Sequence, residues 1–211
     1  KAGLQLAVHA IGDKAIDTVI GSFRLIEDEF SNYRHRIEHA SVLRLEQIEQ
    51  LSRLGLLIAV QPHFIISDWW AVRRVGEKRA SWLYPSKSLI DNQVKIGFST
   101  DCPVEPLNPW ETVYAAISRG KREGIELSKY TSDEALTLLE ALHYYTKGAA
   151  YFFFEEENTG TLEPGKYADF IALDKDPFEV SLDELLSIKT LLTVVSGRVV
   201  YQGNFFKDRL N

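Results

Sequence analysis

The chain has 211 residues, of which 45% are hydrophobic and 26% are charged. This composition is typical of a globular protein and excludes a disordered, collagen-like or wholly coiled-coil chain. Lysine and arginine total 24 against 30 aspartate and glutamate residues, and the formal charge of −6 disfavours nucleic acid as a partner. The longest apolar run, 149–154, is far shorter than the roughly 20 residues that span a bilayer. No apolar signal segment opens the chain, so we expect no membrane partner and a cytoplasmic location.

The chain contains one cysteine and no methionine. Cys102 cannot form an internal disulfide, which is typical of a reducing compartment and leaves histidines and carboxylates as candidate metal ligands. We expect Cys102 to be a small buried side chain rather than a nucleophile, because no base is placed beside it. Since the sequence has no methionine and opens with Lys1, it is expected to be a fragment of a longer protein.

Strand-like and helical patterns alternate through the first half of the chain. The apolar runs that predict strands lie at 4–8, 36–38, 56–60 and 94–99. The patterns that predict helices lie at 15–30, 43–54, 109–122 and 132–148, the last with Ser132 as its N-cap. This order predicts parallel strands joined by crossover helices. Four such units in about 120 residues correspond to half of a (β/α)8 barrel, which takes about 250 residues.

A long connection, residues 63–93, separates the third and fourth predicted strands. Connections longer than about 12–15 residues are commonly functional. With Trp69, Trp70 and Trp82, this one is either a lid that contacts an aromatic or apolar part of a substrate, or a packed excursion with a small core. His63, at its start, either contacts substrate or packs the loop.

The last quarter of the chain changes to short strands punctuated by glycine and proline. Strand-like runs lie at 169–173 and 189–202, and a turn at 196–198 predicts a hairpin within the second run. We therefore expect an α/β chain with a partial barrel at 1–157 and a β-rich segment at 158–211.

Polar side chains stand where three of the predicted strands end. His9 closes the first strand, His39 the second and Asp101 the fourth. Because the carboxyl ends of parallel barrel strands converge on one mouth, we expect these three side chains to meet there. Two imidazoles and a carboxylate suit Zn²⁺ or another divalent cation. Asp101 can also act as the catalytic group that accepts and returns a proton.

The neighbours of these histidines are assigned structural roles. Asp13 is expected to cap the helix after the first strand. Glu38 and His39 lie on opposite faces of a strand, so only one of them can point into the barrel interior. We assign His39 to the interior and expect Glu38 to pair with an arginine such as Arg34 or Arg36.

Five motifs resemble, in their order along the chain, those of the amidohydrolase superfamily, in particular its branch of large metal-dependent enzymes that includes N-substituted formamide deformylases. They are HAIGD at 9–13, HRIEHA at 35–40, VQPHF at 60–64, STDCPVEPLNPW at 99–110 and GTLEPGKYADFIAL at 160–173. The resemblance implies strands five to eight of a TIM-like (β/α)8 metal-dependent hydrolase barrel, with their helices. It also implies part of a small β-sandwich, the composite domain of that family.

The resemblance further implies hydrolysis of C–N bonds in amide-type small molecules by metal-activated water. His9, His39 and Asp101 would be the metal ligands, with Asp101 also the proton shuttle and one or two ions, zinc first among them, in the complete enzyme. His63 falls in the region of the seventh strand and would contact substrate or the transition state.

The sequence also departs from the pattern of the superfamily. Its His-x-His pair at strand one and its bridging Lys or Glu near strand four are absent here. We therefore expect the chain alone to be inactive, and to associate with the missing N-terminal half or to form a homo-oligomer, because it exposes strand edges. The alternatives are a non-catalytic assembly or small-molecule-binding domain of barrel origin, and a lyase or isomerase that uses the same metal. A His-x-His upstream would favour the hydrolase.

Overall fold

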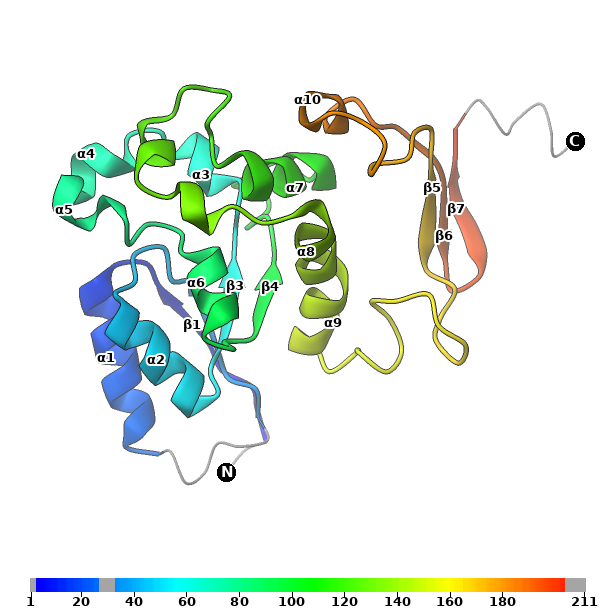
Figure 1. Ribbon diagram of the computed structural model, residues 1–211. Helices are drawn as coiled ribbons and strands as arrows, with labels where there is room; N and C mark the ends of the chain where they lie inside the picture. The colour runs from blue at the N-terminus through cyan, green and yellow to red at the C-terminus, as the bar shows by residue number, and fades with distance from the viewer. Residues whose placement is uncertain (1–2, 27–32, 204–211) are drawn as a thin grey trace, which may run out of the picture.

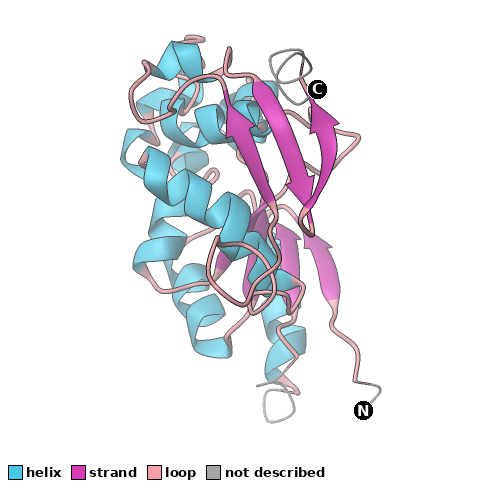
Figure 2. Ribbon diagram, turned by 90° about the vertical axis from the view of Figure 1, so that its right-hand side faces the viewer, coloured by secondary structure: helices cyan, strands magenta, loops and turns pink. Residues whose placement is uncertain are grey.

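Two sheets organise the chain, and Figure 2 shows the three-stranded one in front of and above the four-stranded one. The computed structural model describes residues 3–26 and 33–203. The parallel strands, in sheet order, are β1 (Ala7–Ala10), β2 (Arg36–His39), β3 (Leu57–Val60) and β4 (Ile96–Phe98). The antiparallel strands are β5 (Phe170–Leu173), β6 (Thr190–Val195) and β7 (Arg198–Gln202). The parallel order and the β6–β7 hairpin were both predicted.

Helices follow each parallel strand (Figure 1). Those of the first half are α1 (Asp13–Arg24), α2 (Leu45–Leu54), α3 (Phe64–Ser67), α4 (Ala71–Val75), α5 (Glu77–Ala80), α6 (Ser86–Asp91) and α7 (Pro109–Ser118). The later ones are α8 (Leu138–His143), α9 (Ala149–Phe152) and α10 (Leu182–Leu185). Short 3-10 turns lie at Glu126–Lys129 and Ser132–Glu134, and a π turn at Tyr144–Gly148 joins α8 to α9. The first helix was predicted to run to residue 30, but α1 ends at Arg24 with Leu25 as its C-cap; residues 27–30 lie outside the described part of the chain.

The main hydrophobic core lies between the parallel sheet and its helices. Ile37 of β2 and Ile58 of β3 are fully buried there, against Ile16 and Ile20 of α1 and Leu51 of α2. Successive residues of a strand point to opposite faces of the sheet, so the residues next to Ile37 in β2 and next to Ile58 in β3 face the other side. Alternate apolar residues of the strands and the apolar residues at helical spacing in α1 and α2 thus form one buried hydrophobic layer.

On the other face of the sheet, α9 packs across β3 and β4. Phe152 forms a small cluster with Leu57 and Ala59 of β3. A Cβ added at Gly97 of β4 would lie 2.9 Å from the Phe152 ring and 3.2 Å from the carbonyl oxygen of Gly148. Only glycine at position 97 therefore leaves room for this segment, which Figure 1 shows beside β4.

The first strand begins later than its apolar run predicts. β1 starts at Ala7, while Leu4 and Leu6 are 70% and 46% exposed, so the prediction of a buried strand at 4–8 is wrong for these residues. Among the described residues β1 pairs on one side only, with β2. Residues 4–6 therefore lack the neighbouring strand and the packing on both faces that bury a central strand of a parallel sheet.

The helix predicted at 132–148 begins six residues later. Thr137 is its N-cap, and a reciprocal pair of hydrogen bonds with Glu140 forms a capping box that starts α8 at Leu138. Ser132 opens only a short 3-10 turn. The helix at 109–122 also stops early, at Ser118, because Arg119 takes a left-handed backbone conformation with φ of 54°.

The long connection between β3 and β4 forms four short helices with a core of their own. Ile65, Val72 and Leu83 are buried in this cluster, as one of the two hypotheses expects. Trp69 and Trp70 lie outside it, with exposed fractions of 55% and 40%.

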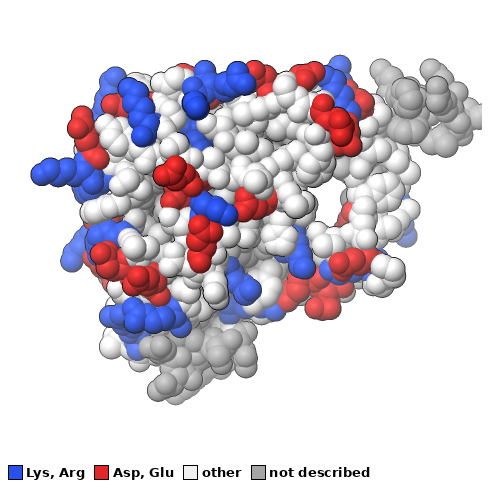
Figure 3. All heavy atoms as spheres, viewed as in Figure 1, with Lys and Arg blue, Asp and Glu red and all other residues white. Residues whose placement is uncertain are grey.

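Charged side chains of both signs are interspersed on the face drawn in Figure 3. In the described part of the chain no helix has the length and apolar character needed to cross a bilayer. Leu185 and Ile188 of the C-terminal segment join the main core, so packing crosses the predicted boundary at residue 157.

Candidate functional site

Two imidazoles meet at the carboxyl ends of β1 and β2. The ring centroids of His9 and His39 lie 4.7 Å apart, with the ring planes at 74°. In the strand register His39 pairs with Ala10, while His9 pairs with Glu38. His39 has a φ of 78°, in the left-handed region where a side chain costs roughly 1–2 kcal/mol. This conformation ends the regular alternation of β2 at His39. Strained backbone of this kind is common at functional sites.

Glu38 has the arginine partner that the sequence predicts. Nε of Arg36 donates to the Glu38 carboxylate at 2.6 Å. Arg34 lies elsewhere, and its guanidinium donates to the carboxylate of Glu156. That hydrogen bond is the largest effect holding the pKa of Glu156 below its ordinary value and the pKa of Arg34 above it. Of the two candidates, Arg36 is therefore the partner.

The prediction that Asp13 caps α1 is wrong. Gly12 occupies the N-cap position without a side-chain cap hydrogen bond, and Asp13 is the first helical residue. The Asp13 carboxylate instead accepts a hydrogen bond of 3.3 Å from Arg44, at the start of α2. Asp13 is structural, as expected, but as a link between two helices.

Asp101 lies in the turn that follows β4, with φ of 52° and an exposed side chain. Cys102 is exposed as well, so the prediction of a buried cysteine is wrong; the turn leaves the sheet and carries the thiol outward. Among the residues that the structure describes, no three His, Cys, Asp or Glu side chains lie close enough to hold a metal ion. The structure therefore pairs His9 with His39 and does not bring Asp101 into a three-ligand set with them.

Gln61 is a site residue that the sequence reasoning missed. Its side chain follows β3, is only 4% exposed, and lies with Oε1 2.9 Å from Nδ1 of His39. The same amide donates to Oγ of Ser99 at 2.8 Å and to the carbonyl oxygen of Ala59 at 3.1 Å. Its one sequence signal is an amide side chain directly after an uninterrupted apolar strand.

His63 is held by a buried carboxylate from the loop after β4. Nδ1 of His63 and the hydroxyl of Ser67 both hydrogen-bond to Glu105, which is 7% exposed. Nε2 of His63 lies 3.7 Å from the carboxylate of Glu111. The ring orientation is thus fixed on one side by Glu105, a residue that the sequence reasoning also missed.

A cavity of about 260 Å³ adjoins His63. It is lined by Ile66, Asn108, Glu111, Tyr114, Glu123 and Leu186 besides His63. Burial, together with a hydrogen bond to Glu123, raises the pKa of Tyr114 to about 12, so this phenol stays protonated at neutral pH. Trp69 and Trp70 do not line this cavity; the guanidinium groups of Arg73 and Arg74 lie over their rings, 5.5 and 5.7 Å from the centroids.

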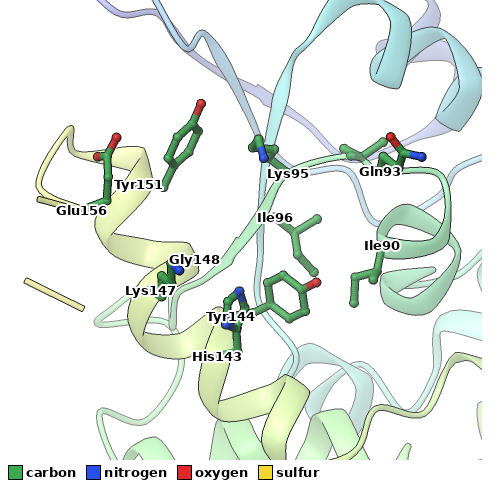
Figure 4. A pocket seen from close by; sticks show the side chains of 11 residues that line it. Ile90, Gln93, Lys95, Ile96, His143, Tyr144, Lys147, Gly148, Tyr151 and Glu156 are labelled. Carbon is green, nitrogen blue, oxygen red and sulfur yellow. The ribbon is translucent and has the colours of Figure 1, made fainter. Parts of the chain in front are cut away.

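A larger cavity of about 420 Å³ lies beside the segment that leads into β4 (Figure 4). Lys95 and Ile96 line one side, and His143 and Lys147 line the other. Burial lowers the pKa of His143. This cavity adjoins the amino end of β4, whereas ligand sites of parallel α/β sheets lie at the carboxyl ends. The candidate site is therefore the edge that carries His9, His39 and His63.

The donor set at this edge suits a divalent transition metal. Imidazole nitrogen is a preferred ligand of zinc, and a carboxylate is the common companion. His39 also has a hydrogen-bond partner on Nδ1, the kind of outer support that ligating histidines usually have. Two imidazoles are fewer than the three protein ligands of a catalytic zinc site, so further ligands are needed.

Comparisons with known proteins agree on one family. The model of the Amidohydrolase family matches residues 1–201. The chain is 33% identical over 202 residues to YtcJ of Bacillus subtilis (strain 168), covering 95% of this chain and 38% of YtcJ. It is 30% identical over 206 residues to the N-substituted formamide deformylase of Arthrobacter pascens, covering 96% of this chain and 37% of that protein. The crystal structure of an uncharacterized metal-dependent hydrolase from Pyrococcus horikoshii OT3 superposes with a TM-score of 0.78 at 46% identity, covering 86% of this chain and 36% of that one. The chain thus spans well under half the length of these relatives.

Proposed function

Because the chain belongs to the amidohydrolase family, we propose that it is the carboxy-terminal part of a metal-dependent hydrolase that cleaves C–N bonds in amide-type small molecules. One observation carries the proposal, the meeting of the His9 and His39 rings at the carboxyl ends of adjacent parallel strands. The similarity to the N-substituted formamide deformylase of Arthrobacter pascens, whose name specifies an amide-type substrate, supports the same bond type.

We further propose that β1 to β4 are strands five to eight of a TIM-like barrel. Their consecutive order and parallel pairing agree with this assignment, and among the described residues β1 and β4 each pair on one side only. An amino-terminal half would close the barrel there, and the chain alone would be inactive. In the same proposal residues 1–157 form the partial barrel, and residues 158–211, with β5 to β7, belong to a small β-sandwich.

His9 and His39 would hold the cation, zinc first among the candidates, with further ligands supplied by Asp101 and by parts of the protein outside this chain. When bound, such a cation polarises the substrate carbonyl and makes water nucleophilic near neutral pH. The Asp101 carboxylate would accept a proton from the attacking water and return it to the leaving nitrogen. His63, oriented by Glu105, would contact the substrate, and Trp69 and Trp70 would cover its apolar part.

Substitution of Asp101 in the natural-length protein tests this mechanism. Asp101→Asn keeps the size of the side chain but removes its basicity, so kcat should fall by about 10²–10⁴. The urea midpoint of the metal-free protein should stay close to that of the wild type, because the Asp101 side chain is exposed in this part of the protein. Cys102→Ser, at the next exposed position, is the matched control and should retain activity. Near-normal turnover of Asp101→Asn would overturn the mechanism.

A non-catalytic binding domain is the second candidate. The observation that favours it is the two-histidine rather than three-ligand cluster within the described residues. It predicts that the natural-length protein carries no stoichiometric metal and hydrolyses no amide.

A further inference from the structure

The buried side-chain amide of Gln61 links the carboxyl ends of three strands. Its Oε1 meets Nδ1 of His39, the last residue of β2, and its Nε2 meets Oγ of Ser99, the first residue after β4. The second contact of Nε2 is the carbonyl oxygen of Ala59, in β3 itself, at 3.1 Å. Gln61 therefore has partners at both ends of its amide, as a buried polar side chain should.

The Ala59 carbonyl determines which end of the amide faces His39. A backbone carbonyl oxygen only accepts hydrogen bonds, so the Gln61 atom beside it must be the NH₂ group. Turning the amide over would set two acceptor oxygens, those of Gln61 and Ala59, against each other at 3.1 Å in a buried place, at a cost that proteins avoid. Oε1 of Gln61 therefore faces the imidazole, whatever the state of the ring.

This orientation selects one tautomer of His39. An amide oxygen has no hydrogen to give, so Nδ1 of His39 must be the donor in the 2.9 Å contact. A neutral imidazole carries one N–H, and with that hydrogen on Nδ1 the lone pair is on Nε2.

We propose that Gln61 is a positioning residue that holds neutral His39 as the Nδ1–H tautomer and so presents Nε2 for metal binding. The inference rests on the proposed role of His39 as a ligand. Loss of such an outer-shell partner typically costs 10–100-fold in metal affinity. Since Ser99 precedes Asp101 by two positions, the same amide also fixes the strand end from which Asp101 projects.

The tautomer can be read directly by long-range ¹H–¹⁵N NMR on this chain, labelled at histidine, free of metal and at about pH 8, where an ordinary imidazole is neutral. His39 should show the Nδ1–H pattern in the wild type and lose it in Gln61→Leu. Gln61→Glu keeps an acceptor oxygen beside Nδ1 and should keep this pattern, although its second carboxylate oxygen faces the Ala59 carbonyl and lowers stability. His35 is the internal reference: its Nδ1 accepts from the backbone N–H of Leu6 at 3.0 Å, so it should show the opposite Nε2–H pattern in every folded variant.

Zinc affinity gives the second readout, measured on the natural-length protein by competition with a chromophoric chelator. Gln61→Leu should bind zinc about 10–100-fold more weakly, and Gln61→Glu should stay closer to the wild type. A His39 that is Nε2–H in the wild type, or that keeps its tautomer in Gln61→Leu while His35 reports a folded chain, would overturn the inference. An Nδ1–H His39 in a protein that binds no zinc would support the hydrogen-bond assignment and overturn the metal proposal instead, so the two failures are distinguishable.

Discussion

His9 and His39 lie at the ends of two strands, β1 and β2, with helix α1 between them in the chain, and their imidazole rings meet edge to face with centroids 4.7 Å apart. Parallel pairing of β1 with β2 brings the two strand ends together. The left-handed backbone conformation of His39 then ends β2 at this residue. A pair of imidazoles at the carboxyl edge of a parallel sheet is therefore a direct product of this local topology.

Glu105 should be coupled energetically to His63. Replacing Glu105 with glutamine is expected to lower the free energy of unfolding by about 1–3 kcal/mol, because the buried carboxylate serves both His63 and Ser67. In a His63→Ala background the same change should cost less, since one partner is already gone. Urea denaturation of the four proteins measures the coupling, and equal costs in both backgrounds would contradict it.

Much of the fold could be predicted from the sequence because its signals are local. Period-two and continuous apolar runs located β2 and β3, and helical spacing located α2. The start of α8 was missed although Thr137 and Glu140 form the capping-box pattern in the sequence, because Ser132 offered a competing start.

The candidate site was only partly predictable. The polar residues His9 and His39 stand out at strand ends, where topology alone brings them together. Gln61 and Glu105 could not be assigned from sequence, because their roles depend on the donors and acceptors that other segments place around them. Buried polar side chains acquire their meaning only from such tertiary partners.

Arg119 should stabilise the end of the long connection. Its side chain is 2% exposed and donates to the carbonyl oxygens of Tyr84 and Leu83, at 3.1 and 3.3 Å. Burial lowers the pKa of this guanidinium to about 10, which still leaves it charged at neutral pH. Arg119→Ala should cost about 2–4 kcal/mol of unfolding free energy, since it leaves two buried carbonyls without donors and opens a cavity.

A matched control for Arg119 lies three positions along the chain. Arg122 pairs with Asp183 at 3.2 Å, but both side chains are 58% exposed, so Arg122→Ala should cost less than about 1 kcal/mol. Thermal or urea unfolding compares the two variants. Equal losses of unfolding free energy in the two variants would contradict the claim that the buried side chain of Arg119 stabilises the connection.

His35 should make stability sensitive to mild acid. Burial lowers the pKa of His35 below its ordinary 6.5, and Nδ1 accepts a hydrogen bond from Leu6 that only the unprotonated nitrogen can accept. The neutral form is therefore favoured by folding. The contribution of neutral His35 to the free energy of unfolding is fully present above about pH 6.5. It is lost as the pH falls through the lowered folded-state pKa of this residue.

The test for His35 compares unfolding free energies of the metal-free chain between about pH 8 and pH 5. His35→Gln can still accept from Leu6 but does not titrate, so its stability should fall less over this range. Identical slopes for the two proteins would contradict the assignment of the acid sensitivity to His35.

Metal content, measured by elemental analysis of the natural-length protein purified without chelator, tests the central claim most directly. The account predicts stoichiometric zinc or a similar divalent ion in the wild type. His9→Ala and His39→Ala should each lose it, while His143→Ala, which changes a histidine beside the other cavity, should retain it. A wild type without metal, or full occupancy in folded His9→Ala and His39→Ala proteins, would contradict the claim that this pair of imidazoles belongs to a metal centre.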